Sequence, residues 1–228
     1  MVASCAAHLI VRRPMIDSTR RLDETNVQLG KELWLIHSSL AVYRVIGLNA
    51  RQLASGGALF GFVQNQALSA VALGLGKVFE REQPGTHELC SVTGVYRLAK
   101  EVPVRDTSAA SAFAKLYGVT PSADWIHDVD QVLCSQRPRI QRHMSVIDRV
   151  RNTRLAHIQQ MASDGILPNI AAFEELLAFA VAFHSFINEA FLSVHSHPIL
   201  SDRQVEDGLL RVLRLIGVAD PLSRFPGV

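Results

Sequence analysis

The sequence predicts an all-α fold, and three observations lead to that prediction. Apolar residues recur at three- and four-residue steps through most of the 228 residues, as on one face of a helix. Runs of β-branched residues with a period of two, and tight hairpin turns, are missing. Hydrophobic residues make up 48% of the chain and charged residues only 19%. That balance excludes a disordered protein and allows a sizeable buried core.

Two long helices are predicted in the first part of the chain. The first runs from about Asp17 to Ala50, and the apolar stripe on its buried face consists of Leu22, Leu29, Leu33, Ile36, Leu40 and Tyr43. The second runs from about Gly57 to Glu82, where a Pro-Gly turn ends it. Its Gly74-Leu75-Gly76-Lys77 run lacks the other residues of a phosphate-binding loop, so we interpret these glycines as helix-packing positions.

In the middle of the chain, the sequence predicts two short helices followed by a long one. Short helices are expected over Cys90–Lys100 and Thr107–Tyr117, the second of which Gly118 stops. A long helix is expected over Pro121–Ser163, with Pro138 as a point of interruption. An exposed polar patch is expected near its start, at His127, Asp128 and Asp130.

Two helices are predicted at the C-terminal end. Asn169 is placed to cap a helix over Ile170–Val194, in which the phenylalanines and His184 are expected to be core residues. Ser201 and Gln204 have the spacing of a capping box for the last helix. Gly217 ends that helix, and its buried stripe is expected to be Val205, Leu209, Leu213 and Ile216.

The domain organisation follows from the absence of repeats, low-complexity tracts and flexible linkers. We expect one all-helical domain over residues 15–228, preceded by a disordered extension over residues 1–14 that ends before a second methionine, Met15.

Two apolar stretches raise the alternative of a membrane protein. The first contains Gln64-Asn65-Gln66, which point to three sides of a helix, and burying an unpaired amide in lipid costs roughly 2–7 kcal/mol. We therefore expect no membrane span. The cysteines lack metal or redox spacing, so the prediction is a cytoplasmic protein.

Positive charge is concentrated in one segment of the predicted long helix. The net charge of the whole chain is only +2. Between residues 137 and 154, however, the single acid Asp148 accompanies six arginines, namely Arg137, Arg139, Arg142, Arg149, Arg151 and Arg154. Such a segment is typical either of a site for an anionic partner such as RNA or of a solvated helix face.

One arginine in this segment falls on the apolar side of the helix. The expected buried stripe is Ile140, Met144, Ile147, Leu155 and Ile158, and it passes through Arg151. An arginine on such a line is costly unless it is paired or functional. His157 follows six residues later. An arginine can stabilise a phosphate transition state, and a histidine can transfer protons near neutral pH, so this pair suffices for RNA cleavage without a metal or another cofactor.

The spacing between these two residues is not distinctive by itself. An arginine and a histidine at this separation occur three times, and composition alone accounts for about two of them. The pair Arg81 and His87 spans a Pro-Gly turn, and Arg137, which precedes His143, is followed directly by a proline. Only the third pair has a continuous helical context, with Asn152 directly after the arginine.

The segment RNTRLAH, from Arg151 to His157, resembles the motif of the HEPN superfamily (higher eukaryotes and prokaryotes nucleotide-binding). Two earlier segments, at Leu33–Arg44 and Leu89–Glu101, are similar to its AbiU-type abortive-infection branch. The resemblance implies a bundle of about four core helices that dimerises with the two motifs facing each other. Active members are metal-independent endoribonucleases of phage-defence or toxin–antitoxin systems, so an antitoxin protein is an implied partner.

The resemblance assigns roles to residues of this chain. It implies that Arg151 and His157 are catalytic and that Asn152 supports them, while Arg142, Arg149 and Arg154 are expected to bind the RNA backbone. Arg151 and His157 point about 120° apart on a straight helix, which favours a site shared by two subunits. Two alternatives stay open, namely a non-catalytic helical module that binds RNA, a nucleotide or a protein, and a small-molecule enzyme.

Overall fold

The computed structural model describes residues 4–80, 90–150, 170–194 and 199–218, with side-chain positions for 17–80, 90–149, 170–194 and 199–218. Every regular element in these ranges is helical and none is a strand, so the all-α prediction is confirmed for this part of the chain. The elements are, in order, α1 (Ser4–Leu48), η1 (Ala54–Gly56), α2 (Gly57–Val78), α3 (Val92–Ala99), α4 (Thr107–Leu116), α5 (Trp125–Val150), α6 (Ile170–Ile187), the π-helical η3 (Asn188–Leu192), η4 (Ile199–Ser201) and α7 (Gln204–Leu215).

The boundaries agree with the sequence patterns in most places and differ in two. Helix α1 begins at Ser4, well before Asp17, where the sequence predicts its start. Helix α5 continues through Pro138, which the sequence predicts as a point of interruption. Gly118 and Gly217 both have positive φ, 75° and 90°, and end the helices before them as expected. The proposed cap at Asn169 lies outside the described residues.

Helix α6 lies at the centre of the fold because it is apolar on almost every side. Its phenylalanines are all buried, and Phe179, Phe183 and Phe186 pack against aromatic side chains of α4 and α5. Phe186 lies 5.0 Å from Phe113 between ring centroids, and Trp125 at the start of α5 lies 5.0 Å from Phe191. Aromatic pairs at these distances add roughly 0.5–1.5 kcal/mol each beyond the burial of their area. The expectation that the phenylalanines of this helix are core residues is confirmed.

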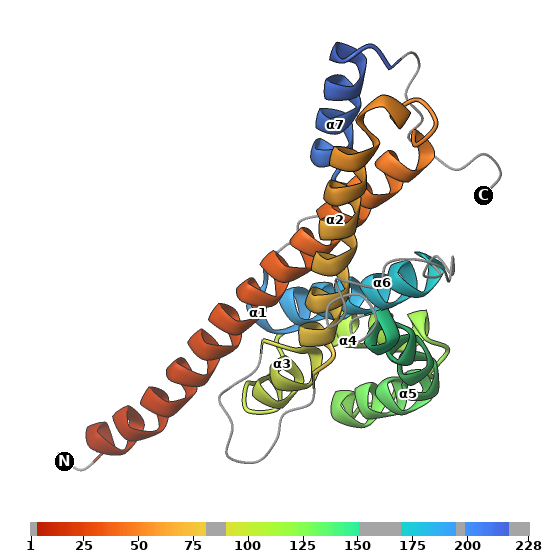
Figure 1. Cartoon of the computed structure of the whole chain (residues 1–228). Helices are drawn as coiled ribbons and strands as arrows, with labels where there is room; N and C mark the ends of the chain where they lie inside the picture. Colours follow the sequence, from red (N-terminus) through yellow and green to blue (C-terminus); the bar gives the residue numbers. More distant parts are fainter. Residues whose placement is uncertain (1–3, 81–89, 151–169, 195–198, 219–228) are drawn as a thin grey trace.

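The other long helices surround α6. Helix α1 contacts α2 and α6, and α5 also contacts α2 and α6, while α3 and α4 cover the remaining sides of α6. In Figure 1, α1 runs diagonally through the whole molecule, α2 returns along its C-terminal half, and α3 to α6 gather around the middle. The four longest helices therefore enclose one hydrophobic cluster. The finer assignment to a HEPN-like bundle stays a proposal.

Helices α1 and α2 pack closely because α2 presents a glycine at their contact. A Cβ added to Gly74 would lie 2.6 Å from Cγ1 of Ile36, which is itself buried. The interpretation of this glycine as a packing position agrees with that contact. Farther along the same pair, Gln64 Nε2 donates a hydrogen bond of 3.1 Å to the carbonyl of Tyr43, so one of the three consecutive amides of α2 is satisfied by the backbone of α1.

A buried polar cluster joins α1 to the end of α6. Asn26 Nδ2 donates to Oδ1 of Asn188 at 2.7 Å, and His184 lies directly beside them with only 7% of its surface exposed. Burial lowers the pKa of His184, which keeps the ring neutral inside the core. The expectation of a hydrogen-bonded core histidine is confirmed. The π-helical turn that follows leaves the Ala190 carbonyl free to accept from the amides of Arg105 and Asp106, at 2.7 and 3.1 Å.

Helix α7 docks on α1 through a second, smaller hydrophobic cluster. Asp202 organises the contact, since its carboxylate accepts from Trp34 Nε1 at 2.9 Å and from the amide of Gln204 at 2.9 Å, and its carbonyl oxygen lies 2.8 Å from Nε2 of His37. The predicted capping box is therefore wrong, because Ser201 belongs to η4 and the N-cap residue of α7 is Arg203, while the carboxylate of Asp202 accepts from the first amide of the helix. Ile216 is 55% exposed, so the expected stripe ends at Leu213.

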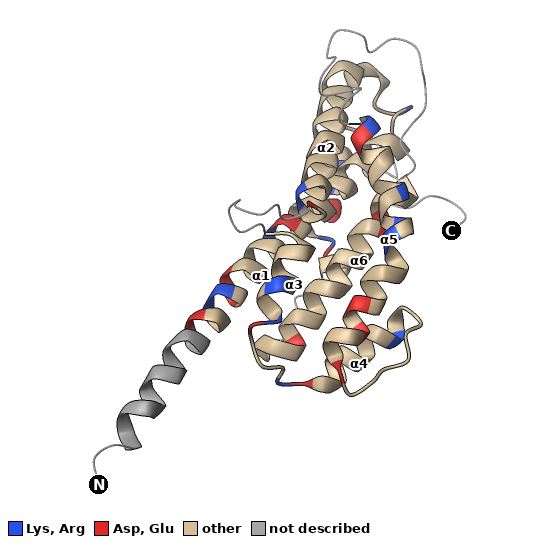
Figure 2. Ribbon diagram, turned by 90° about the horizontal axis from the view of Figure 1, so that it is seen from below, with Lys and Arg blue, Asp and Glu red and all other residues tan. Residues whose placement is uncertain are grey.

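Two helical stretches are apolar and long enough to cross a membrane by length and composition, residues 54–78 and 170–192. Of their apolar windows, 33% and 56% are buried inside the structure. Figure 2 shows α2 almost without charged residues, and the apolar side chains on its first turns, Leu59 and Phe62, are 63% and 61% exposed. The absence of a membrane span stays a prediction of the sequence.

The close contact between α1 and α2 predicts the effect of adding one methyl group. Gly74→Ala should lower the free energy of unfolding by roughly 1–3 kcal/mol, because the added Cβ would lie 2.6 Å from the buried Ile36 and the packing would have to shift. Gly208→Ala is the matched control in α7, where an added Cβ meets nothing within 4 Å. That variant should gain roughly 0.5–1 kcal/mol from helix propensity. Urea denaturation measures both, and equal stabilities would contradict the packing described here.

Candidate nucleic-acid interface on α5

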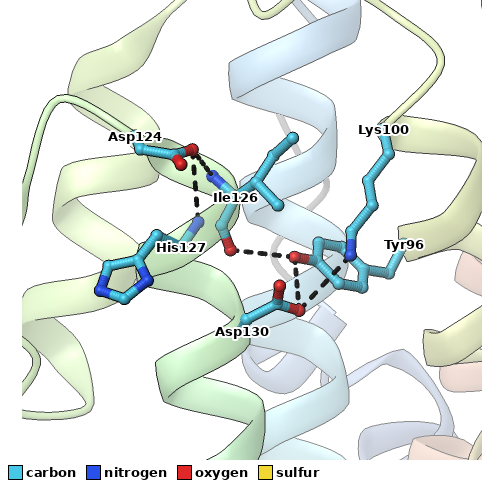
Figure 3. Close-up of polar contacts among 6 residues, drawn as sticks. All are labelled: Tyr96, Lys100, Asp124, Ile126, His127 and Asp130. Atoms are coloured by element: carbon cyan, nitrogen blue, oxygen red, sulfur yellow. Dashed lines mark hydrogen bonds and ion pairs between the residues drawn. The ribbon is translucent and has the colours of Figure 1, made fainter.

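The start of α5 is fixed by two aspartates. Asp124 Oδ1 accepts from the backbone amides of Ile126 and His127, at 3.0 and 3.3 Å, which satisfies two amides that have no partner within the helix (Figure 3). Asp128 is 2% exposed, and its carboxylate accepts from the amide and the hydroxyl of Ser122, at 2.9 and 2.7 Å. The prediction that Asp128 belongs to an exposed patch is therefore wrong, because this carboxylate closes the turn before the helix.

Helix α3 holds the same end of α5 in place. The Oη atom of Tyr96 lies 2.9 Å from Oδ1 of Asp130 and 3.1 Å from the carbonyl of Ile126, and Lys100 Nζ lies 3.4 Å from the same Asp130 oxygen (Figure 3). Burial and the neighbouring carboxylate raise the pKa of Tyr96 well above its ordinary value, so the phenol is neutral and donates. These contacts orient α5 relative to the core.

Two predicted RNA-binding residues lie on the outer face of α5. The buried side of the helix contains Ile147, which is fully buried, with Ile140 and Met144 packed against the core, so the described part of the expected stripe is confirmed. Arg142 and Arg149 point about 180° away from that stripe. Both are exposed, and neither makes an ion pair with any residue that the structure describes. Their positions are compatible with a role in binding a polyanion.

The proposed catalytic residues lie beyond the end of α5. Arg151, Asn152, Arg154 and His157 are all outside the described residues, and so are residues 151–163 of the helix expected over Pro121–Ser163. Their roles stay predictions. The structure does describe α5, which ends one residue before Arg151, and it shows which side of this helix is buried and which side faces solvent.

A cluster of three charged or titratable side chains lies between α5 and α6. Glu175 Oε2 accepts from Arg139 Nε at 2.8 Å and lies 2.7 Å from Nε2 of His143. The hydrogen bond from Arg139, followed by the one from His143, lowers the pKa of Glu175 below its ordinary value of 4.5. From the sequence alone, the pair of Arg137 and His143 is set aside as a catalytic candidate, because a proline follows Arg137. Arg139 and His143 are four residues apart on one helix, and that spacing is the signal that was overlooked.

A small pocket opens beside this cluster. It has a volume of about 170 Å³ and lies between the end of α4, α5 and α6. Tyr117 and Phe179 form its aromatic wall, with ring centroids 5.2 Å apart, and Gln136 adds an amide. Burial raises the pKa of Tyr117 to about 12, so its phenol is neutral at physiological pH. The pocket thus combines a hydrogen-bonding rim with an apolar, aromatic wall.

Comparison with known proteins adds no family name. No family model, no curated protein and no solved structure matches this chain. Within the described ranges, no three histidine, cysteine, aspartate or glutamate side chains are grouped so that they could hold a metal ion. His195 and His197 lie outside those ranges. The outer face of α5 and the Glu175 cluster are therefore the features from which a function is inferred.

The lowered pKa of Glu175 predicts an acid-dependent loss of stability. Because folding lowers this pKa, its contribution is present above the ordinary value of 4.5 and is lost as the pH falls through the folded value. Glu175→Gln lacks this contribution, so the difference in unfolding free energy between wild type and variant should shrink with acidification. Urea titrations at several pH values between about 3 and 7 measure it.

The same pair of proteins, compared in an Arg139→Met variant, tests whether Arg139 causes the pH dependence of Glu175. When Arg139 is replaced by Met, the contact that does most to lower the pKa of Glu175 is gone, so the pH dependence attributed to Glu175 should become smaller. The assignment of Arg139 as the main partner of Glu175 is wrong if the same pH dependence persists in the Arg139→Met protein.

Proposed function

We propose that this protein is a metal-independent endoribonuclease that binds RNA along α5 and cleaves it with Arg151, Asn152 and His157. The observation that carries the proposal is the pair of exposed arginines on the outer face of α5, Arg142 and Arg149, which have no acidic partner among the described side chains. Seven residues separate them, so they lie about 10.5 Å apart along the axis and on the same side of the helix. A row of guanidinium groups fits the regularly spaced phosphates of a nucleic acid.

The proposed reaction uses the 2′-hydroxyl of the RNA as nucleophile. His157 takes the proton of this hydroxyl or gives one to the leaving group, which a side chain with a pKa near neutrality can do. The 2′-oxygen attacks phosphorus and the bond to the 5′-oxygen breaks, which leaves a 2′,3′-cyclic phosphate and a 5′-hydroxyl. Arg151 stabilises the charge on the phosphate oxygens in the transition state, and Asn152 supports it. Arg154 adds a contact to the RNA backbone.

The resemblance of Arg151–His157 to the HEPN motif supports the biological part of the proposal. It favours a homodimer in which two motifs face each other, an antitoxin protein as partner, a cytoplasmic site and a role in phage defence or a toxin–antitoxin pair. The sequence spacing favours the dimer independently, since side chains about 120° apart on one helix act on one phosphate more easily across two subunits. The alternative is a helical module that binds RNA, a nucleotide or a protein without cleaving.

Cleavage provides the direct test of the proposed catalytic residues. Purified protein should cleave mixed RNA in the presence of EDTA, and His157→Ala should slow cleavage by roughly 10²–10⁴-fold, the usual contribution of a general acid or base. His127→Ala is the matched control, because His127 is an exposed histidine near the start of α5. Equal activity of wild type and His157→Ala, or a requirement for added metal, would rule out the proposed mechanism.

Binding can be tested apart from cleavage. On a His157→Ala background, replacing Arg142 and Arg149 together by Gln should weaken binding of a single-stranded RNA and lower the slope of log K against log salt by about 1.4. Fluorescence anisotropy at several salt concentrations measures this slope. Arg211 and Arg214 are exposed arginines on α7, and their double replacement by Gln should leave the slope unchanged. Equal slopes for the two double variants would exclude α5 as the RNA-binding face.

A further inference from the structure

The pocket beside Glu175 has hydrogen-bonding capacity that the protein itself does not use. Oε2 of Glu175 takes both contacts of the cluster, with Arg139 and His143. Its second oxygen, Oε1, makes no hydrogen bond with any residue in the described ranges. Arg139 contacts the carboxylate through Nε, so its two terminal nitrogens are left to donate. The rim therefore offers an acceptor beside several donors.

The charge of this rim excludes the simplest ionic ligands. A phosphate would have to approach the carboxylate of Glu175, and an ammonium group would have to approach the guanidinium of Arg139. Since these two groups neutralise each other, the pocket favours an uncharged ligand that has a donor next to an acceptor. The wall of Tyr117 and Phe179 is aromatic, and the volume of about 170 Å³ accommodates one planar ring system. A nucleobase has all of these properties.

The location of the pocket relates it to the outer face of α5. Arg142 follows Arg139 by three residues, so it lies about 4.5 Å farther along the axis and about 60° around the helix. A nucleotide whose base enters the pocket would place its phosphate toward Arg142, which is exposed and makes no ion pair among the described residues. One face of α5 would then contact the backbone, and the adjacent side would contact a base.

We propose that the pocket formed by Tyr117, Gln136, Arg139, Glu175 and Phe179 binds an unpaired nucleobase. If the base belongs to RNA, this inference rests on the proposed function, because the pocket would select which single-stranded nucleotide is held next to Arg142. The hydrogen-bonding edge of Glu175 and Arg139 selects against ligands without a base. The same chemistry would also hold the base of a free mononucleotide, and the experiment separates these two sources.

Equilibrium dialysis with the four ribonucleoside 5′-monophosphates and with ribose 5-phosphate tests the pocket. At least one nucleotide should bind about tenfold or more tightly than ribose 5-phosphate, because only the nucleotide can fill the pocket. Glu175→Gln should reduce that preference, since it changes the acceptor that meets the base. Arg142→Gln should weaken both ligands by a similar factor and leave their ratio unchanged.

A second pair of variants blocks the pocket without removing its polar groups. Ala178 lines the pocket from an exposed position on α6, so Ala178→Phe should fill it and abolish the preference for nucleotides, whereas Ala178→Ser should retain it. Circular dichroism and urea midpoints verify that each variant folds. The pocket is not a base site if ribose 5-phosphate binds as tightly as every nucleotide, or if Ala178→Phe binds nucleotides like the wild type.

A competition experiment shows whether the base that binds in the pocket belongs to RNA or to a free nucleotide. If the pocket serves RNA, a short single-stranded RNA blocked at both ends should displace the bound nucleotide, and Ala178→Phe should weaken that displacement. If it serves free nucleotides, the blocked RNA should not compete. Neither measurement involves cleavage. Equal cleavage by wild type and His157→Ala would therefore overturn the nuclease proposal and leave the base pocket standing, and a failed pocket would leave the nuclease proposal untouched.

Discussion

The fold depends on the burial of α6. Its sequence is apolar on nearly every side, so it is stable in water only where neighbouring helices cover it all round. Helices α1 to α5 supply that cover, and the aromatic side chains of α4 and α5 are placed where they meet those of α6. The polar residues of this helix are then restricted to its two ends. Glu175 lies at the first turns, and His184 with Asn188 lies at the last.

This arrangement also determines what α5 can present outside. Since Ile147 and its neighbours are needed to cover the core, the opposite side of α5 must face solvent, and there the sequence places Arg142 and Arg149. The side facing α6 contains Arg139 and His143, which reach Glu175. One helix thus provides a hydrophobic side, an ion-pairing side and a free basic side. The candidate interface is a consequence of how α5 is rotated on the core.

The sequence predicted the elements better than it predicted the site. Helix positions follow from apolar periodicity and from Gly118 and Gly217, which are local signals, and these were correct. Two of the errors came from contacts between segments distant in sequence. Asp202 rather than Ser201 accepts from the first amide of α7, because Asp202 is held in place by its contacts with Trp34 and His37 on α1. The cluster around Glu175 was missed for the same reason, since it depends on which helix faces α5.

The separation of the structure into two hydrophobic clusters has a consequence for its motions. The small cluster joins α7 to the end of α1 and to the start of α2, and among the described residues it shares no buried residue with the large cluster around α6. The loop residue Asp202 also connects α7 to α1, through its contacts with Trp34 and His37. Opening α7 therefore exposes little of the main core. The amide hydrogens of α7 should exchange with solvent through a local opening, whereas those of α6 should exchange only when the whole molecule unfolds.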